Sequence, residues 1–253
     1  MFDALKEKDN IVSWIRQYYS DNHIKGAVLG ISGGKDSAVV AALMCEAIGA
    51  ENVVGITLPC HSNSADAADA RLVADYYGFE LINIDLTEVF DTFKQQTELL
   101  GRFTDEEVKN ADINLKPRLR MASCYYMAAL LSAVKGGTYL VPGTSNASEL
   151  YLGYFTKFGD SAHDFEVISH LSVREVLQIG EVLNVPVKVL YRTPDDGISG
   201  LSDEEKMGIS YSDVDKLLNN EDIALDAREK IEKMHRAAAH KFVMPHPERA
   251  EKH

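Results

Sequence analysis

The segment Gly30-Ile31-Ser32-Gly33-Gly34-Lys35-Asp36-Ser37 lies between two apolar stretches, and its position decides the predicted fold. The run before it, residues 26–31, is nearly all apolar, which is typical of a strand buried on both faces of a parallel sheet. The stretch after it, to about Ile48, has the composition of a buried helix. A glycine-rich turn between such a strand and helix lies at the carboxyl edge of a doubly wound sheet, where ligands bind.

The side chains of this turn favour phosphate binding. Its two adjacent glycines let backbone amides come close to a phosphate, and the helix that follows contributes positive partial charge at its N-terminus. Ser32 and Ser37 can donate hydroxyl hydrogens, whereas Asp36 suits a phosphate only through a bridging divalent cation. The turn is not a Walker A loop, because Leu29 and Asp36 stand where that motif needs Gly and Ser or Thr.

The alternation of strand and helix continues along the chain. Short apolar runs predict further strands at residues 52–58, 80–84 and 138–141. Apolar residues at helical spacing predict helices at residues 1–20, 65–77 and 86–100. Proline suits the first helical position, so a longer helix is predicted to begin at Pro117. This order favours an α/β fold, a doubly wound, Rossmann-like parallel sheet with helices on both faces.

The second half of the chain is less regular. Ser172 and Glu175 have the spacing of a capping box, which predicts a helix after them. Residues 192–213 are rich in Gly, Ser, Asp and Pro and are predicted to form a loop, long enough to close over a ligand. Residues 223–238 predict a last helix. No internal repeat divides the sequence, and residues 1–253 are predicted to form a single domain.

Composition excludes several classes of protein. The 253 residues are 45% hydrophobic and 26% charged, as in ordinary globular proteins. The 26 Lys and Arg against 39 Asp and Glu give a net charge of −13, which argues against nucleic acid or an anionic membrane as a partner. No apolar run reaches the ~18 residues of a membrane span, and no apolar signal core begins the chain, so a cytoplasmic location is expected.

The three cysteines, Cys45, Cys60 and Cys124, are scattered along the chain. They form no CxxC pair, and this spacing excludes a zinc ribbon or a redox dithiol. Because all three fall on apolar stretches, they are predicted to be packing residues, and no covalent protein nucleophile is expected.

Polar blocks recur after the glycine-rich turn. One of them, NLKPRLRM at 114–121, gathers three basic residues around the predicted helix start. Cations at a helix start oppose the helix dipole, so this block favours an anion site. The other blocks are GTSNASE at 143–149, GYFTKFGD at 153–160, SDEEKMG at 202–208 and HK at 240–241.

These blocks carry a resemblance to known enzymes. SGGKDS at 32–37 resembles the SGGxDS signature of the N-type ATP pyrophosphatases, which cleave ATP between its α- and β-phosphates. The ordered set GTxxxxE, GYFTKxGD, SDExxxG and HK, spread over residues 26–245, resembles the ammonia-dependent NAD synthetases. The resemblance implies that ATP drives the amidation of deamido-NAD by ammonia through an adenylated intermediate. The products would be NAD, AMP and pyrophosphate, in the last step of NAD biosynthesis.

The same resemblance assigns residues. ATP contacts are implied for Gly30, Ile31, Ser32, Gly33, Gly34, Lys35, Asp36, Ser37, Thr144 and Ser202. Deamido-NAD contacts are implied for Arg118, Lys157, Asp164, His240 and Lys241. Asp36 and Glu149 would bind Mg²⁺. A homodimer is implied, and the chain has no room for a glutaminase domain.

The sequence departs from the family pattern in places, and two other functions stay open. Val173 stands where some members have a lysine that reaches ATP, with Arg174 beside it. An enzyme of the same loop class that modifies tRNA is disfavoured by the net charge and the scattered thiols. A nucleotide sensor without turnover is disfavoured by the paired acids Asp36 and Glu149, because simple binding rarely needs two metal carboxylates.

Overall fold

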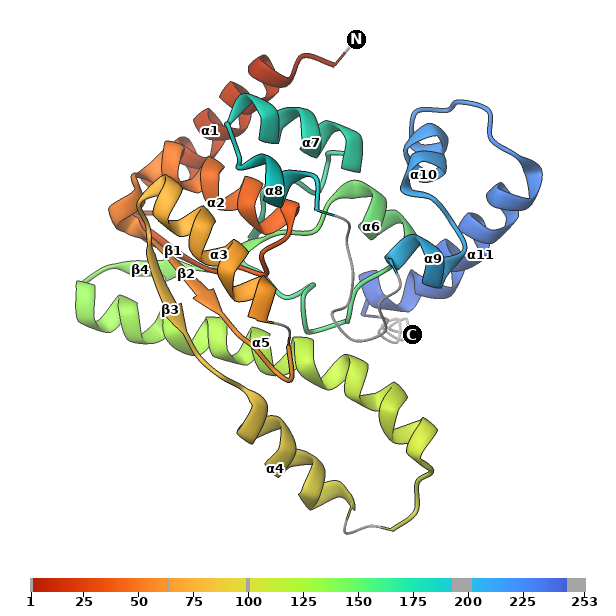
Figure 1. Ribbon diagram of the computed structural model, residues 1–253. Coiled ribbons are helices and arrows are strands. Elements are labelled where there is room, and N and C mark those ends of the chain that lie inside the picture. Colours follow the sequence, from red (N-terminus) through yellow and green to blue (C-terminus); the bar gives the residue numbers. More distant parts are fainter. Residues whose placement is uncertain (1, 63, 99–100, 193–201, 245–253) are drawn as a thin grey trace, which may run out of the picture.

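The computed structural model describes residues 2–62, 64–98, 101–192 and 202–244. At its centre lies a parallel sheet of four strands in the order β3-β2-β1-β4 (Figure 1). The strands are β1 (Ile24–Gly30), β2 (Val53–Thr57), β3 (Glu80–Asn83) and β4 (Thr138–Leu140). In the register, Gly30 pairs with Ile56 and Thr57 with Asn83, so the carboxyl ends of β1, β2 and β3 meet at one edge.

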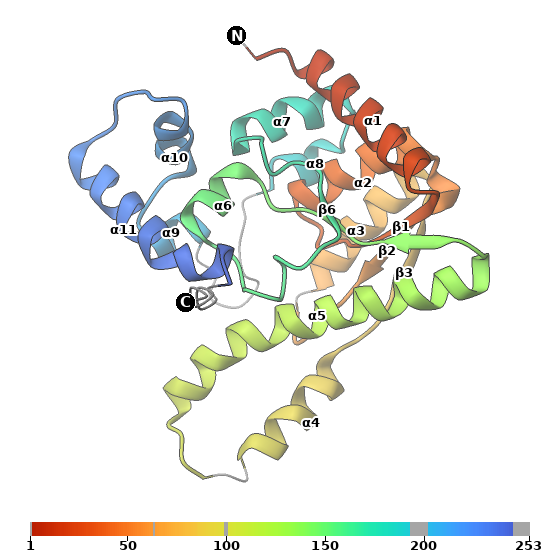
Figure 2. The ribbon, with the colours of Figure 1, turned by 180° about the vertical axis from the view of Figure 1, so that it is seen from behind.

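Helices pack on both faces of this sheet, which confirms the predicted doubly wound fold (Figures 1 and 2). Side chains alternate along the strands, so Ala27 and Leu29 join one core while Val28 and Ile56 join the other. The first core is covered by α1 (Ala4–Asp21), α2 (Lys35–Ile48), α3 (Ser64–Tyr77), α7 (Val173–Val182) and α8 (Val187–Leu190). The second is covered by α4 (Thr87–Glu98) and α5 (Asp105–Lys135). A short 3-10 turn, η1 (Ala50–Asn52), precedes β2.

The start of α5 differs from the prediction. The helix begins at Asp105, because Thr104 and Glu107 form a capping box there, and Pro117 lies inside the helix. A proline inside a helix removes one backbone hydrogen bond without ending this one. The basic residues of NLKPRLRM therefore lie mid-helix, and the argument that they oppose the dipole at a helix start was wrong.

The C-terminal part adds a small sheet and a helical layer. Its elements are β5 (Pro142–Gly143), α6 (Ala147–Leu152), β6 (Phe165–Glu166), α9 (Asp203–Met207), α10 (Tyr211–Leu218) and α11 (Leu225–Phe242). β5 and β6 pair in parallel, and a third core containing Leu152, Val214 and Ile231 joins α6, α10 and α11. The helix predicted at 223–238 is confirmed by α11.

Of the predicted loop at 192–213, residues 193–201 lie outside the described residues. Within the described part, α9 and the first turn of α10 are helical, so the loop prediction was wrong there. The cause is plain in the structure, because Ser202 and Ser210 are N-caps whose hydroxyls accept hydrogen bonds from the backbone of the helices they begin.

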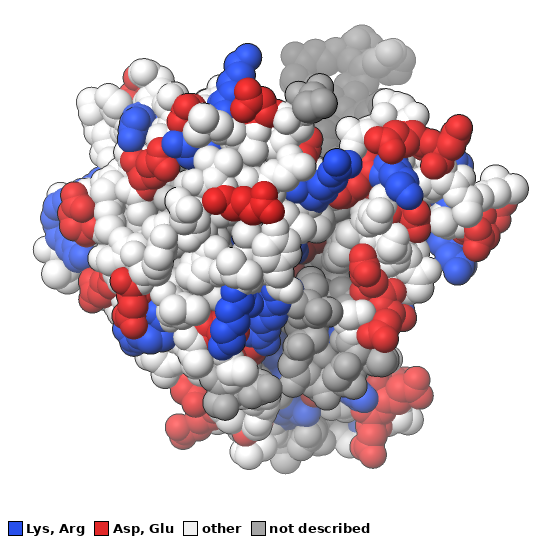
Figure 3. Space-filling model, turned by 45° about the horizontal axis from the view of Figure 1, so that its top comes forward, with Lys and Arg blue, Asp and Glu red and all other residues white. Residues whose placement is uncertain are grey.

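Surface properties follow the composition. In the described ranges no helix is both long and apolar enough to cross a membrane. On the face shown in Figure 3, acidic and basic side chains are interspersed, without a continuous basic surface.

Candidate active site

The glycine-rich turn connects β1 to α2 in a conformation that requires glycine. Gly33 has φ of +82°, and a Cβ added there would lie 2.7 Å from the backbone oxygen of Asp66. Gly34 is the N-cap of α2 and provides no side-chain hydrogen bond to the helix. The first amides of α2 therefore have no side-chain acceptor from their own cap, as in helix N-termini that bind phosphate.

The two serines of the turn stabilise its shape. The Ser37 hydroxyl lies 3.1 Å from the Gly34 carbonyl oxygen, to which it donates, and 3.2 Å from the Ser32 hydroxyl. The Gly34 amide donates to the Ser32 hydroxyl at 3.2 Å. Ser37 is buried and Ser32 is exposed, so Ser32 is the hydroxyl that a ligand can reach.

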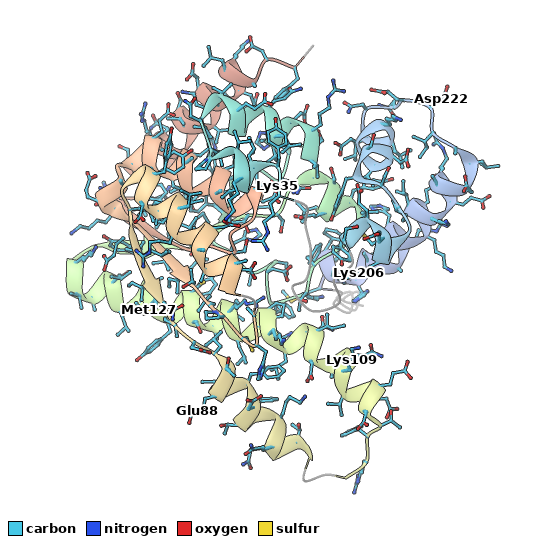
Figure 4. The ribbon with its side chains drawn as sticks, viewed as in Figure 1. Lys35, Glu88, Lys109, Met127, Lys206 and Asp222 are labelled. Atoms are coloured by element: carbon cyan, nitrogen blue, oxygen red, sulfur yellow. The ribbon has the colours of Figure 1, made fainter. Side chains whose placement is uncertain are left out.

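A buried cation and a carboxylate follow directly. Lys35 is 6% exposed, and its ammonium lies 2.8 Å from Asp36 Oδ2. Figure 4 shows Lys35 in the body of the molecule, whereas Glu88 and Lys109 lie on the outlying pair of helices α4 and α5. Burying a lysine is costly unless it is paired, so the ion pair with Asp36 explains why the chain tolerates this charge here.

A second carboxylate, Glu149, reaches the same place from α6. Asn146, the N-cap of α6, donates from Nδ2 to Asp36 Oδ1 at 3.1 Å, and its backbone amide donates to Glu149 Oε2 at 3.3 Å. Loss of solvent around Glu149, and then the negative charge of Asp36, raise the pKa of Glu149 to about 8. A cation beside the two carboxylates would favour their charged forms.

These donors fit Mg²⁺. The described residues contain no cluster of three or more His, Cys, Asp and Glu side chains that could hold a metal. Mg²⁺ typically binds through one or two carboxylates and completes its shell with phosphate oxygens and water. Asp36 and Glu149, beside a phosphate-type loop, have that composition.

Two further ATP contacts were predicted outside the glycine-rich turn, Thr144 and Ser202. Thr144 directly follows β5 and is partly buried. Ser202 is the N-cap of α9, where its hydroxyl donates to Glu205 Oε2 at 2.9 Å. Its role as an ATP contact stays a prediction.

Four of the five predicted deamido-NAD residues form one cluster. The Arg118 guanidinium donates to the Lys157 carbonyl at 3.3 Å, and the Lys157 ammonium donates to the His240 carbonyl at 2.5 Å. The Lys241 ammonium donates to the carbonyls of Gly153 and Phe155 at 2.7 and 2.6 Å. Desolvation lowers the pKa of Lys241. The chain thus gathers Arg118, Lys157, His240 and Lys241 from three separate segments.

Asp164 lies apart from this cluster. Its carboxylate accepts from the Tyr125 hydroxyl at 3.3 Å and from the Val141 amide at 2.7 Å. Tyr125 lies about two turns further along α5 than Arg118. Asp164 therefore lies beside the end of β4, on the same face of α5 as Arg118.

The sequence analysis missed two residues, Asn146 and Asp215. Asn146 joins the two carboxylates, and the spacing of Asn146 and Glu149 is a capping box that the sequence itself displays. The buried Asp215 on α10 accepts from the Ser148 hydroxyl at 2.5 Å and from the Arg174 amide at 3.1 Å, which ties α6 to α7. No sequence pattern indicates that contact. Arg174 contributes its backbone there, and Val173 packs on the third core.

The cysteines lie in apolar surroundings. Burial raises the pKa of Cys124 to about 11 and that of Cys45 to about 12, and it raises the pKa of Cys60 as well. A raised pKa disfavours the thiolate, which is the reactive form.

The fold and the loop together define a doubly wound α/β protein with a glycine-rich turn at the carboxyl edge of its sheet, the edge at which this class of fold binds its ligands. Residues 7–245 match the NAD synthase family. The chain is 40% identical over 245 residues to the NH3-dependent NAD(+) synthetase of Alkaliphilus oremlandii, covering 95% of each protein. It therefore belongs to the NAD synthase family.

Solved structures agree with this assignment. The structure of NMN synthetase from Francisella tularensis superposes with a TM-score of 0.87 at 30% identity, covering 98% of this chain and 99% of that one. NH3-dependent NAD synthetase from Campylobacter jejuni, solved with a nitrate ion, superposes with a TM-score of 0.76 at 29% identity, covering 98% and 100%.

Proposed function

We propose that this protein is an ammonia-dependent NAD synthetase that amidates deamido-NAD at the expense of ATP. The observation that carries the proposal is the convergence of Asp36 and Glu149 beside the α2 N-terminus. Family membership and the relative from Alkaliphilus oremlandii support it. Residues 1–253 then form a single synthetase domain that takes ammonia as its nitrogen donor.

The chemistry requires activation of an inert acid. The nicotinate carboxylate is anionic and resonance-stabilised, so ammonia cannot displace its oxygen directly. In the proposed reaction a carboxylate oxygen attacks the α-phosphorus of ATP, and the bond to the oxygen that leads to the β-phosphate breaks. The amides of the turn, the first amides of α2 and the Lys35 ammonium bind the departing pyrophosphate.

The second half-reaction is acyl transfer. Ammonia attacks the acyl carbon of the adenylate, AMP leaves with the bonding electron pair, and a proton is lost to give the carboxamide of NAD. When bound by Asp36 and Glu149, Mg²⁺ supplies positive charge against the charge that develops on the phosphates. The dinucleotide is bound and oriented by Arg118, Lys157, Asp164, His240 and Lys241. ATP is contacted by Thr144 and Ser202.

A product assay tests the proposal. Purified protein with ATP, Mg²⁺, deamido-NAD and ammonium is expected to yield NAD, AMP and pyrophosphate in equal amounts, measured by chromatography and phosphorus NMR. ADP and inorganic phosphate as products would contradict the cleavage between the α- and β-phosphates. ATP binding without any product would favour the sensor instead.

A second candidate function is the amidation of a mononucleotide. The likeness to NMN synthetase from Francisella tularensis, with its TM-score of 0.87, favours it. The same site would then accept nicotinate mononucleotide and give the corresponding amide. Parallel measurement of kcat/KM with deamido-NAD and with nicotinate mononucleotide decides between them, and we expect the dinucleotide to be preferred at least tenfold.

We also propose a homodimer formed through α5. Tyr126, Leu130 and Val134 recur every four residues on this helix and are 66%, 41% and 81% exposed. On the adjoining α4, Val89 and Phe93 line a groove of about 620 Å³. Exposed apolar area of this kind indicates an interface. Sedimentation equilibrium is expected to give a dimer, and Tyr126→Glu combined with Val134→Glu is expected to give a monomer.

A further inference from the structure

Asn146 occupies a position from which it contacts both carboxylates of the active site. It lies after β5, is the N-cap of α6, and is completely buried, with 0% of its surface exposed. Asp36 lies on α2, and 110 positions separate it from Asn146 in the sequence. The contact between them is therefore a product of the tertiary fold, and it joins the turn after β1 to the first turn of α6.

The hydrogen-bond partners determine how the Asn146 amide is oriented. The Glu149 backbone amide can only donate, and the atom that faces it at 3.0 Å is Oδ1, which accepts. The nitrogen Nδ2 consequently faces Asp36 Oδ1 at 3.1 Å, and an ionised carboxylate can only accept. Reversing the amide would break both bonds, so the side chain is held in one orientation.

Asn146 also holds the second carboxylate. Its backbone amide donates to Glu149 Oε2 at 3.3 Å, which completes the capping box of α6. The Lys35 ammonium takes the other oxygen of Asp36 at 2.8 Å. One residue thus sets the orientation of both Asp36 and Glu149, and the lysine fixes Asp36 from its other side.

Capping alone does not require asparagine here. Ser172 and Ser202 begin α7 and α9 with the same capping box, in which a serine hydroxyl accepts the helix amide. A serine at position 146 could accept that bond, but its single oxygen cannot also lie where Nδ2 contacts Asp36. The amide group combines an acceptor for the helix with a separate donor for the carboxylate.

We infer that Asn146 is a positioning residue that holds Asp36 and Glu149 at the separation and orientation needed to bind one divalent cation. The inference rests on the proposed function, because that function makes the two acids metal ligands. Groups that hydrogen-bond to metal ligands typically change metal affinity or activity by about 10–100-fold when they are replaced.

The test uses Asn146→Ser, which keeps an N-cap and removes the donor to Asp36. Mn²⁺ serves as the probe, and its binding to the protein without nucleotide is titrated by electron paramagnetic resonance. We expect about 10–100-fold weaker Mn²⁺ binding.

In the activity assay, the Mg²⁺ concentration for half-maximal rate rises and kcat falls, while KM for deamido-NAD stays within about twofold. Ser172→Ala is the matched control, because it removes the cap of α7 without touching either carboxylate, and its Mn²⁺ affinity is expected to equal that of the wild type.

The outcomes separate the inference from the proposed function. Unchanged Mn²⁺ affinity in Asn146→Ser, with a thermal midpoint similar to that of Ser172→Ala, would assign Asn146 to helix capping alone and overturn the inference. Asn146→Gly, which is tolerated at an N-cap, is the second variant should the serine variant not fold. Failure of both to fold would also overturn it, since the residue would then serve the fold. If the wild type binds no Mn²⁺ and forms no NAD, the proposed function itself fails.

Discussion

The first turns of α2 and α6 both carry an acid of the active site, yet the two helices begin in opposite ways. α2 begins at Gly34 with no side-chain cap, whereas α6 begins at Asn146 with a complete capping box. The chain therefore satisfies the amides of α6 with its own side chains and leaves those of α2 for a ligand. In the proposed reaction, the difference favours α2 as the helix whose N-terminus binds the phosphates, with α6 supplying a carboxylate.

The largest effect is expected from Asp36→Asn. The change removes one of the two carboxylates that are proposed to hold the cation, while keeping the size of the side chain and the first turn of α2. We expect kcat for NAD formation to fall by about 10²–10³-fold, the loss typical of removing one electrostatic group from an active site. The circular dichroism spectrum should remain that of a folded protein, whereas the thermal midpoint should fall, because the buried Lys35 loses its charged partner. Near-normal turnover would mean that Asp36 is not a metal ligand.

Gly33→Ala tests whether the open N-terminus of α2 depends on the shape of the turn. The new Cβ would lie 2.7 Å from the Asp66 carbonyl at a φ of +82°, so the turn must shift. We expect at least tenfold weaker ATP binding by calorimetry and a loss of about 1–3 kcal/mol in the free energy of unfolding. Gly78→Ala is the control, because Gly78 has φ of +77° but nothing within 4 Å of the added atom. It should lose stability by about 1–2 kcal/mol and keep its ATP affinity.

The raised pKa of Glu149 predicts a pH dependence of stability in the metal-free protein. The pKa of Glu149 is about 8 in the folded chain and 4.5 ordinarily, so between these values the unfolded chain has lost a proton that the folded chain keeps. The stability of the wild type therefore falls as pH rises through this window. Glu149→Gln keeps the capping box and removes the titration.

Urea unfolding in EDTA at pH 5 and pH 8 measures this effect. From pH 5 to pH 8, the free energy of unfolding of the wild type should fall relative to that of Glu149→Gln by at least about 1 kcal/mol. One pKa unit corresponds to about 1.4 kcal/mol. Parallel pH profiles of the two proteins would show that the pKa of Glu149 is not raised in the folded chain.

The smallest effects are expected at the serine caps. Ser172→Ala should lower the free energy of unfolding by about 1 kcal/mol and leave ATP binding unchanged, because Ser172 bonds only within the α7 capping box. Ser202→Ala removes an equivalent cap from α9. A rise of a few fold in KM for ATP in Ser202→Ala, absent from Ser172→Ala, would reveal the proposed ATP contact. Equal KM values for ATP in the two variants would show that Ser202 only caps α9 and does not contact ATP.

Local patterns predicted the strands well, because a short apolar run is a signal carried by adjacent residues. The predicted strand at 80–84 appears as β3, and the capping box of Ser172 and Glu175 begins α7. Two predictions failed where a local signal has two meanings. Pro117 suits a helix start but is tolerated inside α5, and Ser202 and Ser210 are loop-forming residues that also begin helices.

The sequence by itself determined the phosphate-type turn, the doubly wound order of elements and the family, because each depends on residues that are adjacent or in fixed order. The tertiary structure alone decided that Asp36 and Glu149 meet, with Asn146 between them. The parallel sheet causes that meeting, because β1 and β4 are neighbours and the segments that follow them emerge side by side at the carboxyl edge. Spacing along the chain does not encode such proximity, and only the packed core brings the two acids onto the same asparagine.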